Sequence, residues 1–118
     1  MSRPITHFNY ILSKEDLFWM VGLLEGEGCF AWSKSGRKMW PKITIDMTDE
    51  DVIVRFSSLI ERKYFPRPAK PPNKKAHYVC AIAGTPAAEL MNILLPHMGV
   101  RRQKKIREIL VKFNAPIG

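Results

Sequence analysis

The stretch FWMVGLLEGEG, residues 18 to 28, restricts the fold of this chain more than any other part of its sequence. Gly22 and Gly26 stand inside a helical pattern, and each weakens an isolated helix by about 1 kcal/mol relative to alanine. Glu25 and Glu27 place two like charges at the end of an otherwise apolar segment. Local penalties of this kind concentrate at functional positions. We therefore expect this helix to form part of a site.

The segment from Lys14 to Gly26 is predicted to be a helix that is buried on two sides. Ser13 is a good N-cap residue, and Asp16 follows it at the third position, a weak form of the capping box. Leucine, methionine, valine and glycine leave almost no polar face before the acidic end. A helix that is apolar nearly all round must be covered on both sides. The chain's own sheet can cover one side, and the other side needs a further partner.

Two hairpins are predicted after this helix, because the hydrophobic period changes to two. Residues 29–35 and 39–48 form the first hairpin around the turn SGRK, and residues 64–75 and 76–84 form the second across a basic, proline-rich loop. In the first hairpin the apolar face comprises Ile43, Ile45 and Met47, and the polar face Lys42, Thr44 and Asp46. A half-solvated antiparallel sheet always has a polar face, so this alternation alone says little about function.

Helical periods return in three further segments. Residues 48–65 begin at a cap on Thr48 or Asp49, residues 86–98 begin after a cap on Thr85 and end at Gly99, and residues 100–113 form a short basic helix. The expected buried positions are Val52, Phe56, Leu59 and Ile60 in the first of these helices, and Val100, Ile106, Leu110 and Phe113 in the last. The order is helix, two strands, helix, two strands, and one or two helices, which is an α+β arrangement.

Composition narrows the class of partner. The formal net charge of +8 and the pI near 9.8 favour a polyanion, with a merely basic soluble protein as the alternative. The 118 residues are expected to form one domain over 1–118. Cys29 and Cys80 lack a CxxC partner, so we expect reduced thiols, no structural zinc, and an intracellular location in the cytoplasm, an organelle or the nucleoid. No apolar run approaches the ~20 residues that cross a bilayer, so no membrane association is expected.

The nine residues MVGLLEGEG, from Met20 to Gly28, resemble the LAGLIDADG signature of homing endonucleases. The identical positions are Gly22, Leu23 and Gly28, and the conservatively replaced ones are Met20, Leu24, Glu25, Gly26 and Glu27. Val21 replaces a smaller alanine. The resemblance implies the family's αββαββα core over most of the chain, with an antiparallel β-saddle packed under helices and a C-terminal helix.

The resemblance also implies a homodimer. In the family, two motif helices pack against each other at the centre of the molecule, and this chain has one motif. Gly22 and Gly26 form a small-xxx-small pair that lets two helix backbones approach closely, by the steric logic of GxxxG in membranes. The second helix would come from a second copy, in an isologous two-fold interface. The residues expected at this interface are Gly22, Gly26, Met20 and Leu23.

The same resemblance assigns an active site. Glu27 matches the family's last acid and would bind a divalent metal, Mg²⁺ or Mn²⁺, with one such ligand from each copy and with the Gly26 carbonyl as a further contact. Mg²⁺ prefers oxygen ligands of this kind. Glu25 is interpreted as structural. Arg101, in the run RRQKK, would stabilise charge on the phosphate in the transition state, and Asp49 would position water.

The polar face of the hairpins is expected to bind double-stranded DNA, because antiparallel β-ribbons fit the major groove. The candidates in the first hairpin are Ser33, Ser35, Trp40, Lys42, Thr44 and Asp46. Those in the second are Arg67, Lys70, Asn73, Lys74, Lys75 and His77. Its basic loop is expected to contact phosphates rather than bases. Arg102, Lys104 and Lys105 would contact flanking phosphates.

The leading interpretation is therefore a dimeric, metal-dependent homing endonuclease that cuts both strands of a long, nearly palindromic site. An alternative of a different class is the same scaffold without cleavage, either as a maturase of intron RNA or as a DNA-binding regulator, so RNA is the less favoured nucleic acid. A third interpretation is a structural dimer whose basic face is incidental. Glu27 favours the nuclease, because a pure binder has no need of paired acids beside a polyanion.

Overall fold

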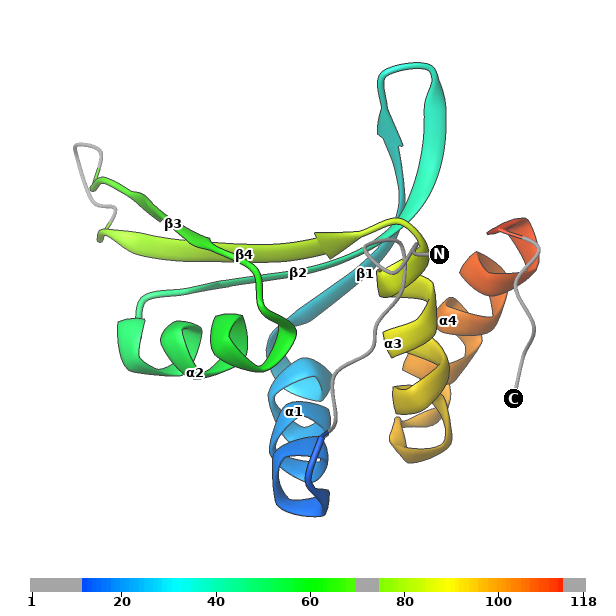
Figure 1. The fold of residues 1–118 in the computed structure, drawn as a ribbon, viewed down its shortest axis with the longest axis horizontal. Helices are drawn as coiled ribbons and strands as arrows, with labels where there is room; N and C mark the ends of the chain where they lie inside the picture. Colours follow the sequence, from blue (N-terminus) through cyan, green and yellow to red (C-terminus); the bar gives the residue numbers. More distant parts are fainter. Residues whose placement is uncertain (1–11, 70–74, 114–118) are drawn as a thin grey trace, which may run out of the picture.

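The computed structural model describes residues 12–69 and 75–113 (Figure 1). Its helices and strands are α1 (Lys14–Glu27), β1 (Gly28–Ser35), β2 (Lys38–Met47), α2 (Glu50–Ile60), β3 (Tyr64–Arg67), β4 (His77–Ala83), α3 (Thr85–Leu94), the short 3₁₀ helix η2 (Leu95–His97) and α4 (Val100–Phe113). The predicted order of elements and the α+β class are confirmed. In this part of the chain no helix is both long and apolar enough to cross a membrane.

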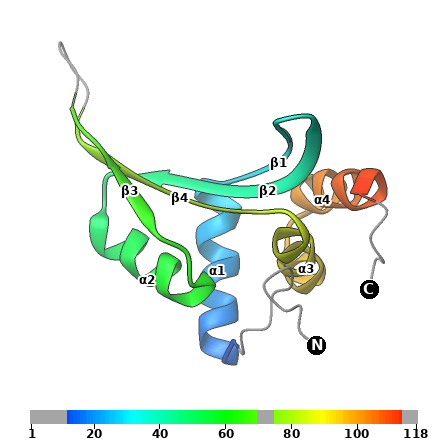
Figure 2. The ribbon, with the colours of Figure 1, turned by 45° about the horizontal axis from the view of Figure 1, so that its top comes forward.

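The strands form one antiparallel sheet with the order β1-β2-β4-β3. Gly28 lies opposite Ile45 at one end of the β1–β2 pair, and Ser35 lies opposite Lys38 beside the turn. Figure 2 shows α1, α2 and α3 on one side of the sheet, while the other side is left open and the β1–β2 hairpin curls upward. The sheet therefore has one face in the core and one face available to a partner.

The core lies between the sheet and the helices. Pro41, Ile43 and Ile45 point into it from β2, and Met20 and Leu24 point into it from α1. The alternation of β2 thus continues through Pro41, as the period of a strand requires. Met47, expected on the same face, is half-buried.

The ends of α1 explain why this segment is helical between residues 14 and 27. The hydroxyl of Ser13 accepts the backbone N–H of Asp16 at 3.0 Å, so the predicted N-cap is confirmed. At the other end the N–H of Gly28 donates to the Leu24 carbonyl. A Cβ on Gly28 would lie 2.7 Å from that carbonyl oxygen. The helix can turn directly into β1 because this position has no side chain.

Several local predictions are wrong. In α2 the buried apolar side chains are Ile53, Phe56 and Ile60, while Val52 and Leu59 are half-buried. The N-cap of α3 is Gly84 at φ 82°, not Thr85, and its N–H donates to the Pro41 carbonyl at 2.9 Å. This bond and the positive φ, which glycine adopts readily, fix the turn from β4 into α3. In α4, Val100 is 86% exposed although it was expected in the core, and Ile109, which was not expected there, is buried.

Candidate functional site

The face of α1 that turns away from the core carries its glycines. Gly22 and Gly26 are exposed, and a Cβ built on either would meet no atom of the described chain within 4 Å. Phe18, one turn before Gly22 on the same stripe, is 48% exposed. Nothing in the chain itself therefore requires glycine at positions 22 and 26. Their lack of side chains leaves a shallow, open helix surface beside an exposed aromatic ring.

Met20 does not belong to this surface. Its side chain is 0% exposed and packs in the core with Leu24, on the helix face opposite Gly22. The prediction that Met20 lies at an interface with a second copy is wrong, because the side chain is already enclosed by its own chain. Leu23 is half-buried at the border between the two faces.

Glu27 is the last residue of α1, and its side chain is exposed. Among the described residues it makes no hydrogen bond or ion pair. The Gly26 carbonyl, in the last turn of the same helix, likewise accepts no hydrogen bond from the described part of the chain. A carboxylate and a carbonyl oxygen therefore stand free at the junction of α1 and β1.

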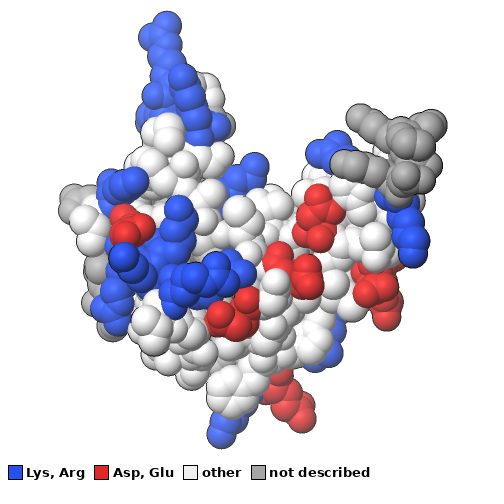
Figure 3. Space-filling view, turned by 180° about the vertical axis from the view of Figure 1, so that it is seen from behind, with Lys and Arg blue, Asp and Glu red and all other residues white. Residues whose placement is uncertain are grey.

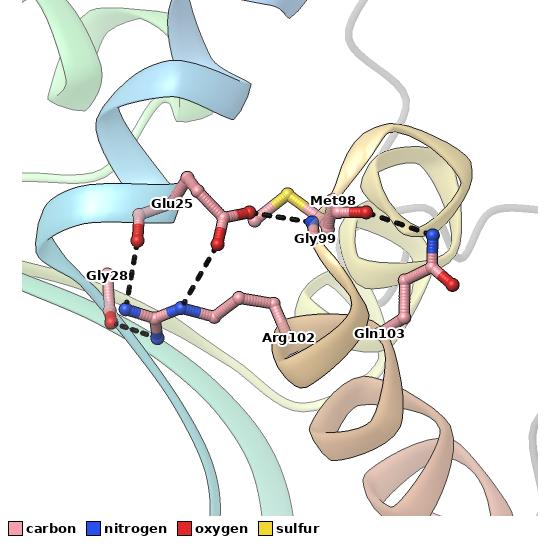
Figure 4. Close-up of polar contacts among 6 residues, drawn as sticks. All are labelled: Glu25, Gly28, Met98, Gly99, Arg102 and Gln103. Atoms are coloured by element: carbon pink, nitrogen blue, oxygen red, sulfur yellow. Dashed lines mark hydrogen bonds and ion pairs between the residues drawn. The ribbon is translucent and has the colours of Figure 1, made fainter.

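Both carboxylate oxygens of Glu25, by contrast, have partners at the start of α4 (Figure 4). Its Oε1 accepts the backbone N–H of Gly99 at 2.8 Å, and its Oε2 lies 3.9 Å from Nε of Arg102. Gly99 directly precedes α4, and its carbonyl accepts the N–H of Gln103 at 2.8 Å, the first bond of that helix. The Glu25 carboxylate thus caps the N-terminus of α4. The interpretation of Glu25 as a structural residue agrees with these contacts.

Arg102 completes the contact between α1 and α4. Its Nη1 donates to the Gly28 carbonyl at 2.7 Å, and its Nη2 donates to the Glu25 carbonyl at 3.1 Å. The side chain is only 16% exposed. We expected Arg102 to hold a flanking phosphate, and this prediction is wrong, because its donors are bound to the chain's own carbonyls. No local pattern could indicate this role, since the partners lie 74 and 77 residues away along the chain.

The other predicted catalytic residues fall on different sides of the molecule. Arg101 is exposed in the first turn of α4, next to Arg102, so its backbone is held near the end of α1 that carries Glu27. Asp49 is the N-cap of α2 and makes no side-chain cap bond. Figure 1 shows this end of α2 pointing away from α1. Within one copy the structure therefore does not bring Asp49 to Glu27.

The oxygen donors at this junction suit a divalent metal in part. No group of three or more His, Cys, Asp or Glu side chains in the described residues could hold an ion. The Glu27 carboxylate and the Gly26 carbonyl are hard oxygen donors, which suit Mg²⁺ or Mn²⁺, and Mg²⁺ commonly keeps several waters and binds through only one or two carboxylates. These residues fit half of a metal site, which a second copy or a bound phosphate would complete.

The open face of the sheet carries the predicted polar residues of the first hairpin. Lys42 and Thr44 are half-buried and Asp46 is exposed, in alternation with the buried residues of β2. Oδ1 of Asp46 is hydrogen-bonded to Nδ1 of His77 in β4, which links the two hairpins on this face. Cys29, opposite Thr44 in the register, is exposed beside them. Ser33, in β1, is half-buried.

Trp40 has an additional contact that the sequence did not predict. Its ring is half-buried, with its centroid 6.2 Å from that of Phe113 at the end of α4 and 5.6 Å from Nζ of Lys38. The ring centroid of Trp32 also lies 6.2 Å from that of Phe113. Both tryptophans therefore pack the first hairpin against α4, and Trp40 is not a freely presented side chain of the open face.

Lysine and arginine gather at two places, the tip of the first hairpin and α4, with acidic side chains between α4 and the second hairpin (Figure 3). The exposed cations at the tip are Lys34, Arg37 and Lys38, and those on α4 are Arg101, Lys104, Lys105, Arg107 and Lys112. The tip residues were missed because SGRK was interpreted only as a turn. In the second hairpin Arg67 and Lys75 are exposed. Lys70, Asn73, Lys74 and the side chain of Ser35 lie outside the described part of the structure.

Comparison with known proteins agrees with this geometry at the level of the fold. No protein-family model matches the chain. No curated protein matches its sequence. Solved structures do match, among them the homing endonuclease I-CvuI in complex with its target in the presence of 2 mM Ca, with a TM-score of 0.66 and 11% identity over 83% of this chain and 65% of that one. The chain has the LAGLIDADG homing endonuclease fold.

A second structure of I-CvuI, in complex with the I-CreI target in the presence of 2 mM Mg and with its DNA not cleaved, gives the same result. The TM-score is 0.61 and the identity 12%, over 86% of this chain and 67% of that one. This chain therefore spans about two thirds of the length of the homing endonuclease that it resembles in fold. At this identity the comparison concerns the LAGLIDADG fold, and the chemistry has to be argued from this chain's own residues.

Proposed function

We propose that two copies of this chain form a divalent-metal-dependent endonuclease that cuts both strands of a long, nearly palindromic DNA site. The observation that carries the proposal is the contrast between two neighbouring acids. Glu25 is bound to Gly99 and Arg102, whereas Glu27 is exposed and free of partners among the described residues. A free carboxylate beside a nucleic acid is unfavourable unless a cation accompanies it. Its place at the end of the motif helix supports a metal-binding role.

The exposed face of α1 supports the dimer. Gly22 and Gly26 leave room for a second helix at close approach, and Phe18 adds apolar surface that a second copy would cover. In a two-fold arrangement each residue of this stripe would meet its counterpart or a close neighbour. The two Glu27 side chains would then stand near the axis, one from each copy. A single-motif endonuclease needs this pairing to cut two strands.

The open face of the sheet supports double-stranded DNA as the partner. It presents Lys42, Thr44 and Asp46 on a curved antiparallel surface, and exposed cations flank it at the hairpin tip and on α4. Flexible lysines at the edges neutralise phosphates without reading sequence, whereas side chains on the strands can reach base edges. The two I-CvuI structures described above are in complex with DNA targets, which agrees with this assignment.

At the proposed active site Glu27 and the Gly26 carbonyl would hold the metal, and Arg101 would offset charge on the reacting phosphate. A bound divalent ion supplies activation of water and stabilisation of the leaving oxygen. Arg101 is exposed and unpaired in the described structure. An arginine in that state can bind a phosphate oxygen directly.

One experiment tests the function and gives the target together. The purified chain is incubated with a randomised duplex library and Mg²⁺, and the cleaved ends are sequenced; Glu27→Gln serves as the control. We expect wild-type protein to produce a consensus with two-fold symmetry, and the variant to bind the selected duplex without cutting it. Undiminished cleavage by Glu27→Gln would refute the catalytic assignment. Selective binding by wild-type protein without cleaved ends would instead indicate a non-cleaving regulator.

A further inference from the structure

We propose that Glu25 and Arg102 are positioning residues that set the metal affinity of the Glu27 site. The proposal rests on the proposed function, because it concerns the same site. In this role the two residues touch neither the metal nor the reacting phosphate and act through the orientation of Glu27 and the Gly26 carbonyl. Both residues belong to an exchange of side chains between the end of α1 and the start of α4 (Figure 4).

The exchange neutralises two helix ends at once. The C-terminus of α1 carries partial negative charge from its free carbonyls, and the N-terminus of α4 carries partial positive charge from its free N–H groups. Arg102, from α4, donates to the carbonyls of Glu25 and Gly28 at 3.1 and 2.7 Å. Glu25, from α1, accepts the N–H of Gly99 at 2.8 Å. Each helix thus supplies the charged side chain that caps the other.

Packing holds this exchange in one geometry. The Arg102 side chain is 16% exposed, and its guanidinium carbon lies 5.8 Å from the centre of the Phe30 ring. Its Nε is buried and has no hydrogen-bond partner, so its nearest compensation is Oε2 of Glu25 at 3.9 Å. Gly99 allows the approach, because a Cβ there would lie 3.2 Å from the Glu25 carboxylate. An arginine held in this way fixes the carbonyls that it binds.

The exchange determines which oxygens remain for a metal. The carbonyls of Leu24, Glu25 and Gly28 each accept a hydrogen bond, from Gly28, Arg102 and Arg102 respectively, while that of Gly26 accepts none in the described chain. The Glu25 carboxylate is likewise occupied, and that of Glu27 is free. Loss of Arg102 would release two carbonyls and Oε2 of Glu25 at the same junction, while Oε1 would keep its bond from the Gly99 N–H. The donors of Glu27 and Gly26 would then lose their fixed orientation.

The test compares Arg102→Ala and Arg102→Lys with Arg55→Ala as a matched control. Arg55, in α2, is also an arginine that contacts α1, since it pairs with Asp16 at 3.1 Å and its guanidinium carbon lies 4.2 Å from the centre of the Trp19 ring, but these partners are two to three turns of α1 away from Glu27. Mn²⁺ binding to the full chain is measured by electron paramagnetic resonance without DNA. Thermal unfolding and the Mg²⁺ midpoint of cleavage are measured in parallel.

We expect Arg102→Ala to weaken Mn²⁺ binding about tenfold or more, in the range found when residues that orient metal ligands are removed. The Mg²⁺ midpoint of cleavage should shift by a similar factor, and Arg102→Lys should recover part of the loss. Arg55→Ala should lower the unfolding temperature and leave both metal readouts unchanged. If Arg102→Ala only lowers the unfolding temperature, or if Arg55→Ala shifts metal binding equally, the positioning role is refuted.

The outcome for wild-type protein separates this proposal from the proposed function. Wild-type protein that binds Mn²⁺ but cuts no duplex would refute the nuclease, and the positioning role would then be decided by Mn²⁺ binding of the variants alone. Wild-type protein that cuts DNA with an Mg²⁺ midpoint equal to that of Arg102→Ala would refute the positioning role and leave the nuclease standing. Wild-type protein that neither binds Mn²⁺ nor cuts would refute both.

Discussion

Gly28 and Leu24 are in direct contact where α1 turns into β1, and a Cβ on Gly28 would lie 2.7 Å from the Leu24 carbonyl oxygen and 2.8 Å from Cδ2 of its side chain. Leu24 is fully buried, so neither atom can move away without disturbing the core. Any side chain at the position that links the motif helix to the sheet would therefore have to displace atoms of Leu24.

The first prediction follows from this contact. Gly28→Ala should lower the free energy of unfolding by about 1–3 kcal/mol, the usual cost of overpacking a buried position. The measurement is urea unfolding at one protein concentration. Cys29→Ala is the control, because Cys29 is the next residue in the same strand and is exposed; its effect should stay within about 0.5 kcal/mol. Equal stability of Gly28→Ala and wild type would contradict the contact.

The second prediction concerns assembly. Gly26→Leu should prevent dimer formation, because its side chain would occupy the open surface that the second helix needs. Sedimentation velocity on wild type and variant measures the effect. Val100→Leu places the same side chain at another exposed helix position, on α4, and should leave the sedimentation coefficient unchanged. A dimer of undiminished stability in Gly26→Leu would contradict close packing of the two helices.

The third prediction uses the two cysteines as internal probes of DNA binding. Cys29 is exposed on the open face of the sheet, whereas Cys80 is buried and its pKa is raised to about 11 because burial disfavours the thiolate. At pH 7.5 a maleimide should therefore modify Cys29 and spare Cys80, since the thiolate is the reactive form. Addition of the target duplex should slow modification of Cys29 about tenfold or more. Mass spectrometry identifies the modified residue, and an unchanged rate would show that DNA binds elsewhere.

The fourth prediction concerns the edge of the DNA surface. The logarithm of affinity should fall linearly with the logarithm of salt concentration, and Lys34→Ala at the hairpin tip should reduce the slope by about 1 if the lysine neutralises one phosphate. Lys14→Ala is the matched control, because Lys14 is the first residue of α1, at the end of that helix away from the sheet (Figure 1). Fluorescence anisotropy at several salt concentrations measures both. Equal slopes for Lys34→Ala and wild type would remove the tip from the interface.

The fold was predictable because it depends on local periods. The alternation in residues 39–48 and the capped helix beginning at Lys14 are properties of adjacent residues, and the structure confirms both. The N-cap of α3 was not predictable, because Gly84 is fixed by a bond to the Pro41 carbonyl. Met20 was placed on the wrong face because a helix that is apolar all round does not show in its sequence which side meets the sheet.

The candidate site was predictable only in part. The motif pointed to Glu27 and separated it from Glu25, and the structure finds the first free and the second engaged. Arg102 was assigned to a flanking phosphate instead of to the end of α1, since a basic run gives no sign of which member turns inward to a distant helix. Asp49 was assigned by analogy, and the position of α2 keeps it away from Glu27 within one copy.

Helices cover only one side of the sheet. Neighbouring residues of one strand therefore alternate between positions that are restricted by core packing and positions that are not. On β2, Pro41, Ile43 and Ile45 are packed in the core. Lys42, Thr44 and Asp46 face outward and make few contacts within the chain. Substitutions at the outward positions are expected to leave folding almost untouched. A chain built in this way can accumulate changes along its exposed strand surface, and so acquire a new binding preference, without first having to repair its stability.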